Sequence, residues 1–292
     1  MTLPPKSPRL KLFKRLSTSR TGPRLTASEI VSSGRSWLAL ALDDMHADRR
    51  PLWGEPRAGA WHPSALGEPC DRLLVLSMLG YRGEAILPKL QRIFDAGNDI
   101  EARWLNRFTE LGILLGSQVP VKRDIPPMIS GKADALITHP YEMTRRLVVE
   151  IKSINSNGFR QLPPVSLDHE VNYHNLMALP TYIGNRIRKY MYQLQVYLVE
   201  GCGQATEGLL LFDNKDTQDF AEYSLLPNPE LIAEKYANLI KLDGYRAMLT
   251  VPPCTCVSRD RGNVVCGYRE AEVLPLTEVQ SMTLRVAPQQ AF

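Results

Sequence analysis

Apolar positions along the chain first follow a helical period. Between Leu90 and Leu111 they recur every three or four residues, which predicts one long amphipathic helix. Its apolar face contains Leu90, Ile93, Phe94, Gly97, Trp104, Leu105, Phe108 and Leu111. Upstream, Thr26-Ala-Ser-Glu29 has the form of a capping box and predicts the start of a helix through residues 37–42. A turn and a short helix ending near Gly80 are expected between these two helices.

Strand-like segments then alternate with helical ones. Five runs rich in apolar and β-branched residues predict strands, at residues 118–122, 129–138, 147–153, 207–213 and 222–226. Two runs with helical spacing predict helices, at residues 185–200 and 229–248. A polar loop is expected after the third strand. The order of helix, three strands, helix and strand predicts an α/β fold, with a mixed central sheet flanked by helices.

Composition is that of an ordinary globular protein. The chain has 292 residues, of which 44% are hydrophobic and 23% are charged. No apolar run approaches the roughly 18 residues that a membrane span requires, so no membrane partner is expected.

Charge is distributed unevenly along the chain. Residues 1–24 carry seven basic and no acidic residues, so the rest of the chain carries 28 basic and 31 acidic residues, a net charge of −3. The folded body is therefore not a general polyanion binder. The basic segment is expected to be a solvated, disordered tail, and the alternatives are steering of nucleic acid and organelle targeting. Without a secretory signal and with five cysteines, a reducing, cytoplasmic location of bacterial or phage-like type is expected.

Two predicted strands carry charged side chains where apolar ones are expected. In Leu147-Val-Val-Glu150-Ile-Lys152, strand alternation places Glu150 and Lys152 on one face. Asp134 interrupts the preceding apolar strand, where aspartate is disfavoured. If the two strands form a hairpin, Asp134 reaches Glu150, and each carboxylate then resists ionisation. A divalent cation resolves this conflict, and oxygen ligands favour Mg²⁺ or Mn²⁺.

A third carboxylate lies in the long predicted helix. Glu101 falls within the apolar stripe, four residues after Gly97 and three before Trp104. A carboxylate in that position is buried or half-buried and needs a partner.

These residues, in this order, resemble the motif of the PD-(D/E)XK nuclease superfamily. Asp134 followed by Glu150-Ile-Lys152 matches the motif, with Ala133 where the family name has proline. Glu101 resembles the first metal ligand of the family. Tyr190-Met-Tyr-Gln193-Leu-Gln-Val-Tyr197 resembles the Tyr-x-x-Gln-x-x-x-Tyr signature of RecB-like and Cas4-like exonucleases. The fold implied is restriction-endonuclease-like.

The resemblance implies a metal-dependent deoxyribonuclease, an exonuclease in preference to an endonuclease. The implied catalytic residues are Asp134, Glu150 and Lys152, with Mg²⁺ or Mn²⁺ held by Glu101, Asp134, Glu150 and the carbonyl of Ile151. The implied DNA-binding residues are Gln193, Tyr197, Arg72 and Ser64. The implied partners are a DNA single strand or duplex end and a protein of recombination or DNA processing. The alternatives are a catalytically silent DNA-binding or scaffold protein on the same fold and a structure-specific endonuclease.

Four cysteines extend the resemblance. Cys70-Asp-Arg72 after Ser64 resembles an element of Cas4-like nucleases in which one upstream cysteine joins three downstream ones around a [4Fe–4S] cluster. Here Cys254, Cys256 and Cys266 would supply the three. Zinc is the alternative, because four thiolates also form structural zinc sites, and unrelated thiols are the third possibility. Cys202 is expected to be an ordinary packed residue.

The expected domain organisation is a basic tail followed by a single nuclease domain. The tail covers residues 1–25 and the domain covers 26–292. The domain is divided into a helical part, a nuclease core and a cysteine-bearing segment, at residues 26–115, 116–246 and 247–292.

Overall fold

The computed structural model describes residues 34, 36–48, 59–81, 86–253 and 285–286. The chain forms two compact units, residues 1–47 and 48–292. In the first unit, helix α3 (Trp37–Met45) begins after Ser36, whose hydroxyl accepts a hydrogen bond from the Ala39 amide at 3.2 Å. Gly34 has a φ of 64° and Ser36 is extended, so one continuous helix from Thr26 is wrong. The predicted tail lies outside the described residues.

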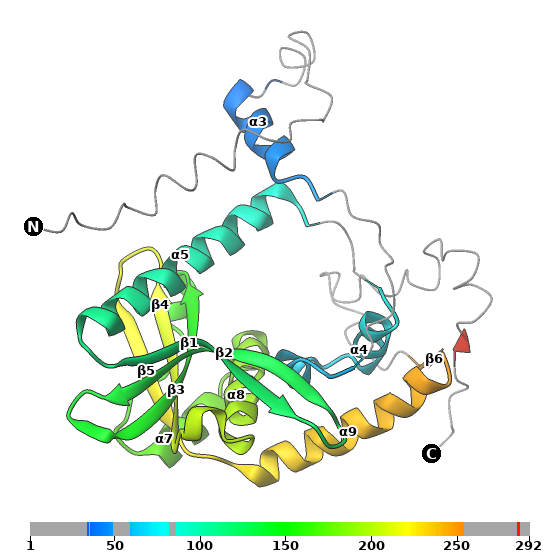
Figure 1. The fold of residues 1–292 in the computed structure, drawn as a ribbon. Coiled ribbons are helices and arrows are strands. Elements are labelled where there is room, and N and C mark those ends of the chain that lie inside the picture. Colours follow the sequence, from blue (N-terminus) through cyan, green and yellow to red (C-terminus); the bar gives the residue numbers. More distant parts are fainter. Residues whose placement is uncertain (1–33, 35, 49–58, 82–85, 254–284, 287–292) are drawn as a thin grey trace, which may run out of the picture. The chain divides into compact units, whose positions relative to one another are not determined.

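The second unit is built on a five-stranded mixed sheet (Figure 1). Its strands are β1 (Leu114–Arg123), β2 (Ile129–His139), β3 (Glu142–Ile154), β4 (Glu207–Asn214) and β5 (Phe220–Leu225). They lie in sequence order, and all neighbours are antiparallel except β3 and β4, which are parallel. A parallel pair needs a long crossover, and here it contains α6 (Ser156–Phe159), α7 (His169–Met177) and α8 (Thr181–Val199). The predicted mixed sheet with flanking helices is confirmed.

Helix α5 (Pro88–Glu110) covers one face of the sheet with its carboxy-terminal half. Ile100, Trp104 and Phe108 are buried against alternate residues of β2, β3 and β4, including Val149 and Ile151. The apolar face predicted for this helix extends too far toward its amino terminus, because that end of α5 continues past the sheet. Three stripe residues there are 41–46% exposed, namely Leu90, Ile93 and Phe94.

A partly buried ion pair attaches α5 to the sheet. Asp213 of β4 is fully buried, and both its carboxylate oxygens accept hydrogen bonds from the Arg103 guanidinium, at 2.9 and 2.8 Å. Trp104 Nε1 donates to the same carboxylate at 2.8 Å. Three hydrogen bonds therefore hold the helix that also carries Glu101.

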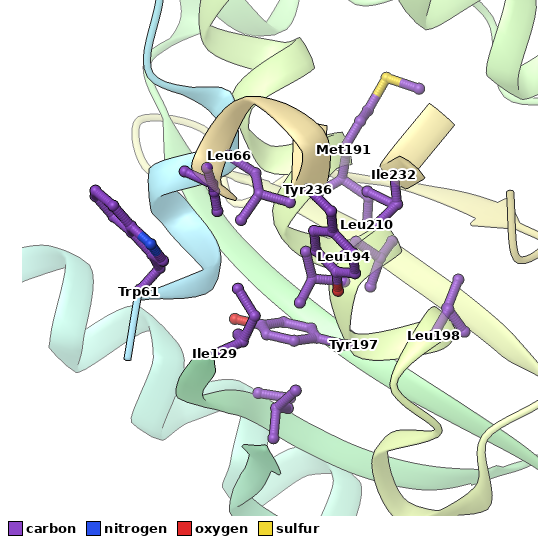
Figure 2. Packing of buried hydrophobic residues seen from close by; sticks show 14 of the residues in the cluster. Trp61, Leu66, Ile129, Met191, Leu194, Tyr197, Leu198, Leu210, Ile232 and Tyr236 are labelled. Atoms are coloured by element: carbon purple, nitrogen blue, oxygen red, sulfur yellow. The ribbon is translucent and has the colours of Figure 1, made fainter. Parts of the chain in front are cut away.

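The opposite face of the sheet is covered by α8 and the segments packed on it. These segments are η1 (Pro63–Gly67), α4 (Asp71–Met78) and α9 (Pro229–Ala247). Figure 2 shows residues of this core, among them Trp61 before η1 and Leu194 of α8. Gly131 of β2 permits the close approach of η1, because a Cβ there would lie 2.4 Å from Cδ of Pro63.

The remaining elements are short. They are η2 (Cys202–Gln204) and the paired strands β6 (Thr250–Val251) and β7 (Arg285–Val286). Cys202 is buried, as expected for a packed thiol, and burial raises its pKa to about 11. Helix α7 replaces part of the predicted polar loop and is capped by Asp168. Within the part of the chain that the structure describes, no helix is both long and apolar enough to cross a bilayer.

Candidate active site

The ladder between β2 and β3 ends beside two carboxylates. The strands pair as far as Ala135 and Val149. At the next position, the side chain of Asp134 accepts a hydrogen bond from the backbone amide of Ile151 at 2.8 Å. Asp134 therefore takes the place of a backbone acceptor, and its carboxylate is fixed next to Glu150.

Glu150 and Lys152 lie on the α8 side of β3, while Val149 and Ile151 face α5. Glu150 is fully buried and forms an ion pair with Lys152. Lys152 Nζ also lies 4.0 Å from Oδ2 of Asp134. The strand period thus brings together the three residues that the sequence singled out.

The pKa values of the site reflect burial and mutual repulsion. Burial raises the pKa of Glu150 to about 7, and Asp134 adds to the rise while Lys152 opposes it. Burial also raises the pKa of Asp134. Burial lowers the pKa of Lys152, but attraction to Glu150 and Asp134 outweighs it, so the net pKa lies above the ordinary value. The lysine therefore stays protonated between the two carboxyl groups.

Glu101 lies on α5, directly after the buried Ile100. Burial raises the pKa of Glu101, and repulsion from Asp134 raises it further. Gln118 of β1 donates a hydrogen bond from Nε2 to Oε1 of Glu101 at 2.8 Å and lowers that pKa. Gln118 lies between the paired residues Ser117 and Val119, across from Asp134.

Gln118 was missed by the sequence analysis. Its φ is 51°, in the left-handed region that non-glycine residues rarely adopt. Such conformations cluster at functional sites, where the surrounding structure maintains them. No sequence signal identifies it, because glutamine on an exposed strand has no pattern of its own.

Gln193 and Tyr197 of α8 are linked to β2 by hydrogen bonds. Tyr197 is fully buried, and its hydroxyl donates to the carbonyl of Lys132 at 3.0 Å, two residues before Asp134. Gln193 Nε2 donates to that hydroxyl at 2.6 Å. Tyr197 and Ile129 of β2 belong to the same buried core, which Figure 2 shows. Gln193 and Tyr197 therefore hold the strand that carries Asp134.

Direct DNA contacts predicted for three residues conflict with their burial. Tyr197 is 0% exposed, Gln193 9% and Arg72 3%. Arg72 Nη1 instead donates to the carbonyl of Pro252 at 3.5 Å and so links α4 to the segment after α9. Ser64 is half-buried in η1, with its hydroxyl 2.9 Å from Nδ1 of His62.

The predicted cysteine cluster is only partly described. Cys70 is buried at the start of α4. The other three predicted ligands, Cys254, Cys256 and Cys266, lie outside the described residues.

The donor set suits a hard divalent cation, although it is not preassembled. Among the described residues, no three His, Cys, Asp or Glu side chains form a ready metal-binding group. Both carboxylate oxygens of Glu150 are buried, and the described side chains that interact with them are the ion-paired Lys152 and the Tyr197 hydroxyl, each of which lowers the pKa of Glu150. These buried oxygens and the carboxylate of Asp134 are ligands of the kind that Mg²⁺ and Mn²⁺ prefer. Binding there would require Lys152 to release Glu150.

Comparison with known proteins gives remote structural similarity. No protein-family model and no curated protein matches the chain. The crystal structure of SSO0001 is similar at 18% identity and a TM-score of 0.40, over 73% of this chain and 87% of that one. An alkaline exonuclease from Laribacter hongkongensis, LHK-Exo, is similar at 13% identity and a TM-score of 0.40, over 65% of this chain and 89% of that one. The structure of LHK-Exo in complex with dAMP is similar at 14% identity and a TM-score of 0.41, over 65% of this chain and 88% of that one. At these scores the functional argument rests on the site itself.

Proposed function

We propose that this protein is a metal-dependent deoxyribonuclease, acting as an exonuclease. The observation that supports it is the fully buried Glu150, with Lys152 and Asp134 beside it and, on α5, Glu101, whose pKa is raised by burial and by repulsion from Asp134. Three carboxyl groups with raised pKa values are costly to assemble, and such clusters concentrate at functional sites.

The proposed ligands of the metal ion are Glu101, Asp134, Glu150 and the carbonyl oxygen of Ile151. A bound divalent cation supplies a water of lowered pKa and neutralises charge on the scissile phosphate. Lys152, which stays protonated, donates hydrogen bonds to the attacking water and to the phosphate oxygens on which negative charge develops. Tyr197 and Gln193 keep β2, and with it Asp134, in position through the carbonyl of Lys132.

The deciding experiment uses the full chain with DNA labelled at either end. It is incubated with Mg²⁺, with Mn²⁺ or with EDTA, and closed circular DNA is tested in parallel. Mononucleotide or short products from linear DNA, with circular DNA intact, support an exonuclease. Cutting of circular DNA indicates an endonuclease on the same site. DNA binding with no cleavage under any metal condition would instead identify a silent DNA-binding protein.

Loss of the Gln118 side chain is expected to weaken metal binding more than catalysis. Gln118→Met keeps the length of the side chain but removes the hydrogen bond that orients Glu101. A hydrogen bond to a charged group contributes about 1.5–3 kcal/mol, and exposure places this one near the low end. We expect roughly a tenfold weaker Mn²⁺ affinity by calorimetry, with kcat at saturating metal mostly retained.

Glu101→Ala serves as the reference for the Gln118 variant, because it removes the proposed ligand itself. It is expected to weaken both Mn²⁺ affinity and activity by more than Gln118→Met does. Unchanged Mn²⁺ affinity in Glu101→Ala would assign Glu101 to a structural role and remove it from the proposed ligand set.

We also propose that Cys70, Cys254, Cys256 and Cys266 hold a [4Fe–4S] cluster with a structural role. The contact of Arg72 with Pro252 supports this, because it places the start of α4 beside the chain two residues before Cys254. Anaerobically purified protein is expected to be brown, with a broad absorption near ~400 nm. Colourless protein with one zinc per chain would replace the cluster by zinc. Folded protein without either metal would leave the cysteines as ordinary thiols.

A further inference from the structure

One turn of α8 carries three basic side chains that differ in their partners. Arg188 is tied to the carbonyls of Met177 and Leu179, at 3.1 and 3.3 Å, and Lys189 is paired with Glu68 at 3.4 Å. Arg186 is exposed, and within the described parts of the chain it has no acidic partner. Its guanidinium charge is therefore available to an external anion.

The Arg186 side chain is held in place by Tyr190. Arg186 Nε donates to the Tyr190 hydroxyl at 2.8 Å, and its guanidinium carbon lies 6.0 Å from the centre of the Tyr190 ring. The ring is half-buried and packs against Phe212 of β4, with centroids 6.3 Å apart. A guanidinium fixed by a hydrogen bond to a packed ring loses less conformational entropy on binding than a free one.

The same ring borders the candidate active site. Lys152 Nζ lies 5.2 Å from the centre of the Tyr190 ring. One aromatic ring thus contacts two cations, the largely buried Lys152 among the carboxylates and the exposed Arg186 at the surface. A polyanion entering the site past Tyr190 would meet Arg186 next to Lys152.

We propose that Arg186 binds a backbone phosphate of the DNA strand, one neighbouring the scissile phosphate. This inference rests on the proposed nuclease function and adds a substrate-binding residue to it. Arginine suits the task because its planar guanidinium donates two parallel hydrogen bonds to phosphate oxygens. The rest of the chain beyond residue 24 has a net charge of −3, so phosphate binding depends on individual cations placed in this way.

The test compares Arg186→Gln with Arg146→Gln, which removes the same charge elsewhere. Arg146 is also exposed, but it lies six residues before Lys152 on β3 and contacts Gly203 and Gln204. Binding of a fluorescent single-stranded oligonucleotide is measured over a series of salt concentrations in the Glu150→Gln background, so that cleavage does not interfere. Steady-state kinetics are measured with the active enzyme, and circular dichroism checks folding.

We expect Arg186→Gln to weaken binding about 5- to 10-fold and to reduce the slope of log K against log salt by about 0.7. In the active enzyme KM should rise while kcat changes little, the pattern of a lost uniform binding contact. Arg146→Gln should match the parent protein. Arg186→Lys should recover most of the salt slope, because the charge is restored.

Three outcomes would overturn the proposal. Unchanged affinity and salt slope in an Arg186→Gln enzyme that cleaves DNA would refute the phosphate contact and leave the nuclease assignment intact. A lower kcat with unchanged KM would show that Arg186 acts on Lys152 through Tyr190 and does not bind the strand. Wild-type protein that does not cleave DNA would remove the nuclease assignment, and this inference with it.

Discussion

Replacing Lys152 with alanine is expected to abolish DNA cleavage while the protein stays folded. Lys152 is the cation that lies next to both Glu150 and Asp134, and attraction to them keeps it protonated. Removing one charge-stabilising donor from an active site typically lowers kcat by about 10²–10³-fold. Cleavage is measured with end-labelled DNA at saturating Mg²⁺ or Mn²⁺.

The control for Lys152→Ala is Lys122→Ala. Lys122 is a largely exposed residue of β1 that pairs with Asp124, so its loss changes the net charge equally but leaves the site intact. Retained activity above about a tenth of wild type in Lys152→Ala would rule out a catalytic lysine. Binding of the oligonucleotide should be largely preserved, because Lys152 acts on the reacting phosphate.

A second variant separates catalysis from stability at this position. Lys152 lowers the pKa of the fully buried Glu150, so removing it leaves an uncompensated buried carboxyl group. In the double variant Lys152→Ala with Glu150→Gln, neither charge remains. If Lys152→Ala proves unstable, the double variant should regain stability without regaining activity.

The pairing of Glu150 with Lys152 in the candidate site could be predicted because side chains alternate strictly between the two faces of a strand. Glu150 and Lys152 share a face whatever the tertiary structure, and their charges in an apolar run require a partner. The strands and the longer helices were predicted for the same reason, since their periodicity is strong. Helix α7 was missed because its sequence is polar and lacks an apolar stripe.

The burial and the partners of side chains that depend on the packing of helices against the sheet could not be predicted. The spacing in α5 shows which residues share a face, but it does not show where the helix extends beyond the sheet, so Phe94 is exposed. Arg72 and Tyr197 matched a binding motif, yet both are used to satisfy backbone carbonyls in the interior. The left-handed Gln118 arises from the local pairing of β1 with β2 around Asp134.

The site is assembled from both faces of the sheet. Helix α5, which carries the proposed ligand Glu101, packs on one face, and α8 holds β2 through Tyr197 from the other. Since Asp134 and Glu150 are fixed within the sheet, the position of Glu101 depends on how firmly α5 is attached. Besides the hydrogen bond of Glu101 itself to Gln118, a nearby polar attachment of α5 among the described residues is the ion pair of Arg103, two residues further along the helix, with Asp213.

Breaking that ion pair from the arginine side is expected to cause the largest loss of stability. Arg103→Met leaves the Asp213 carboxylate fully buried with Trp104 Nε1 as its remaining side-chain donor among those described here. Removing one partner of a fully buried pair costs about 3–5 kcal/mol, and the 33% exposure of the Arg103 side chain places this loss near the low end. That is a large fraction of the roughly 5–15 kcal/mol that stabilises a typical domain. The free energy of unfolding is measured in urea.

The decisive comparison is with Arg103→Met combined with Asp213→Asn. Asparagine keeps an oxygen that accepts from Trp104 but carries no charge, so the double variant should be more stable than Arg103→Met alone. Arg107→Met is the matched control on the same helix, where the guanidinium lies 4.7 Å from the Trp104 ring centre and its loss should cost under about 1 kcal/mol. If Arg103→Met costs no more than Arg107→Met, the pair does not anchor α5. If it does anchor the helix, Mn²⁺ affinity should fall with stability in Arg103→Met, because Glu101 is then less firmly placed.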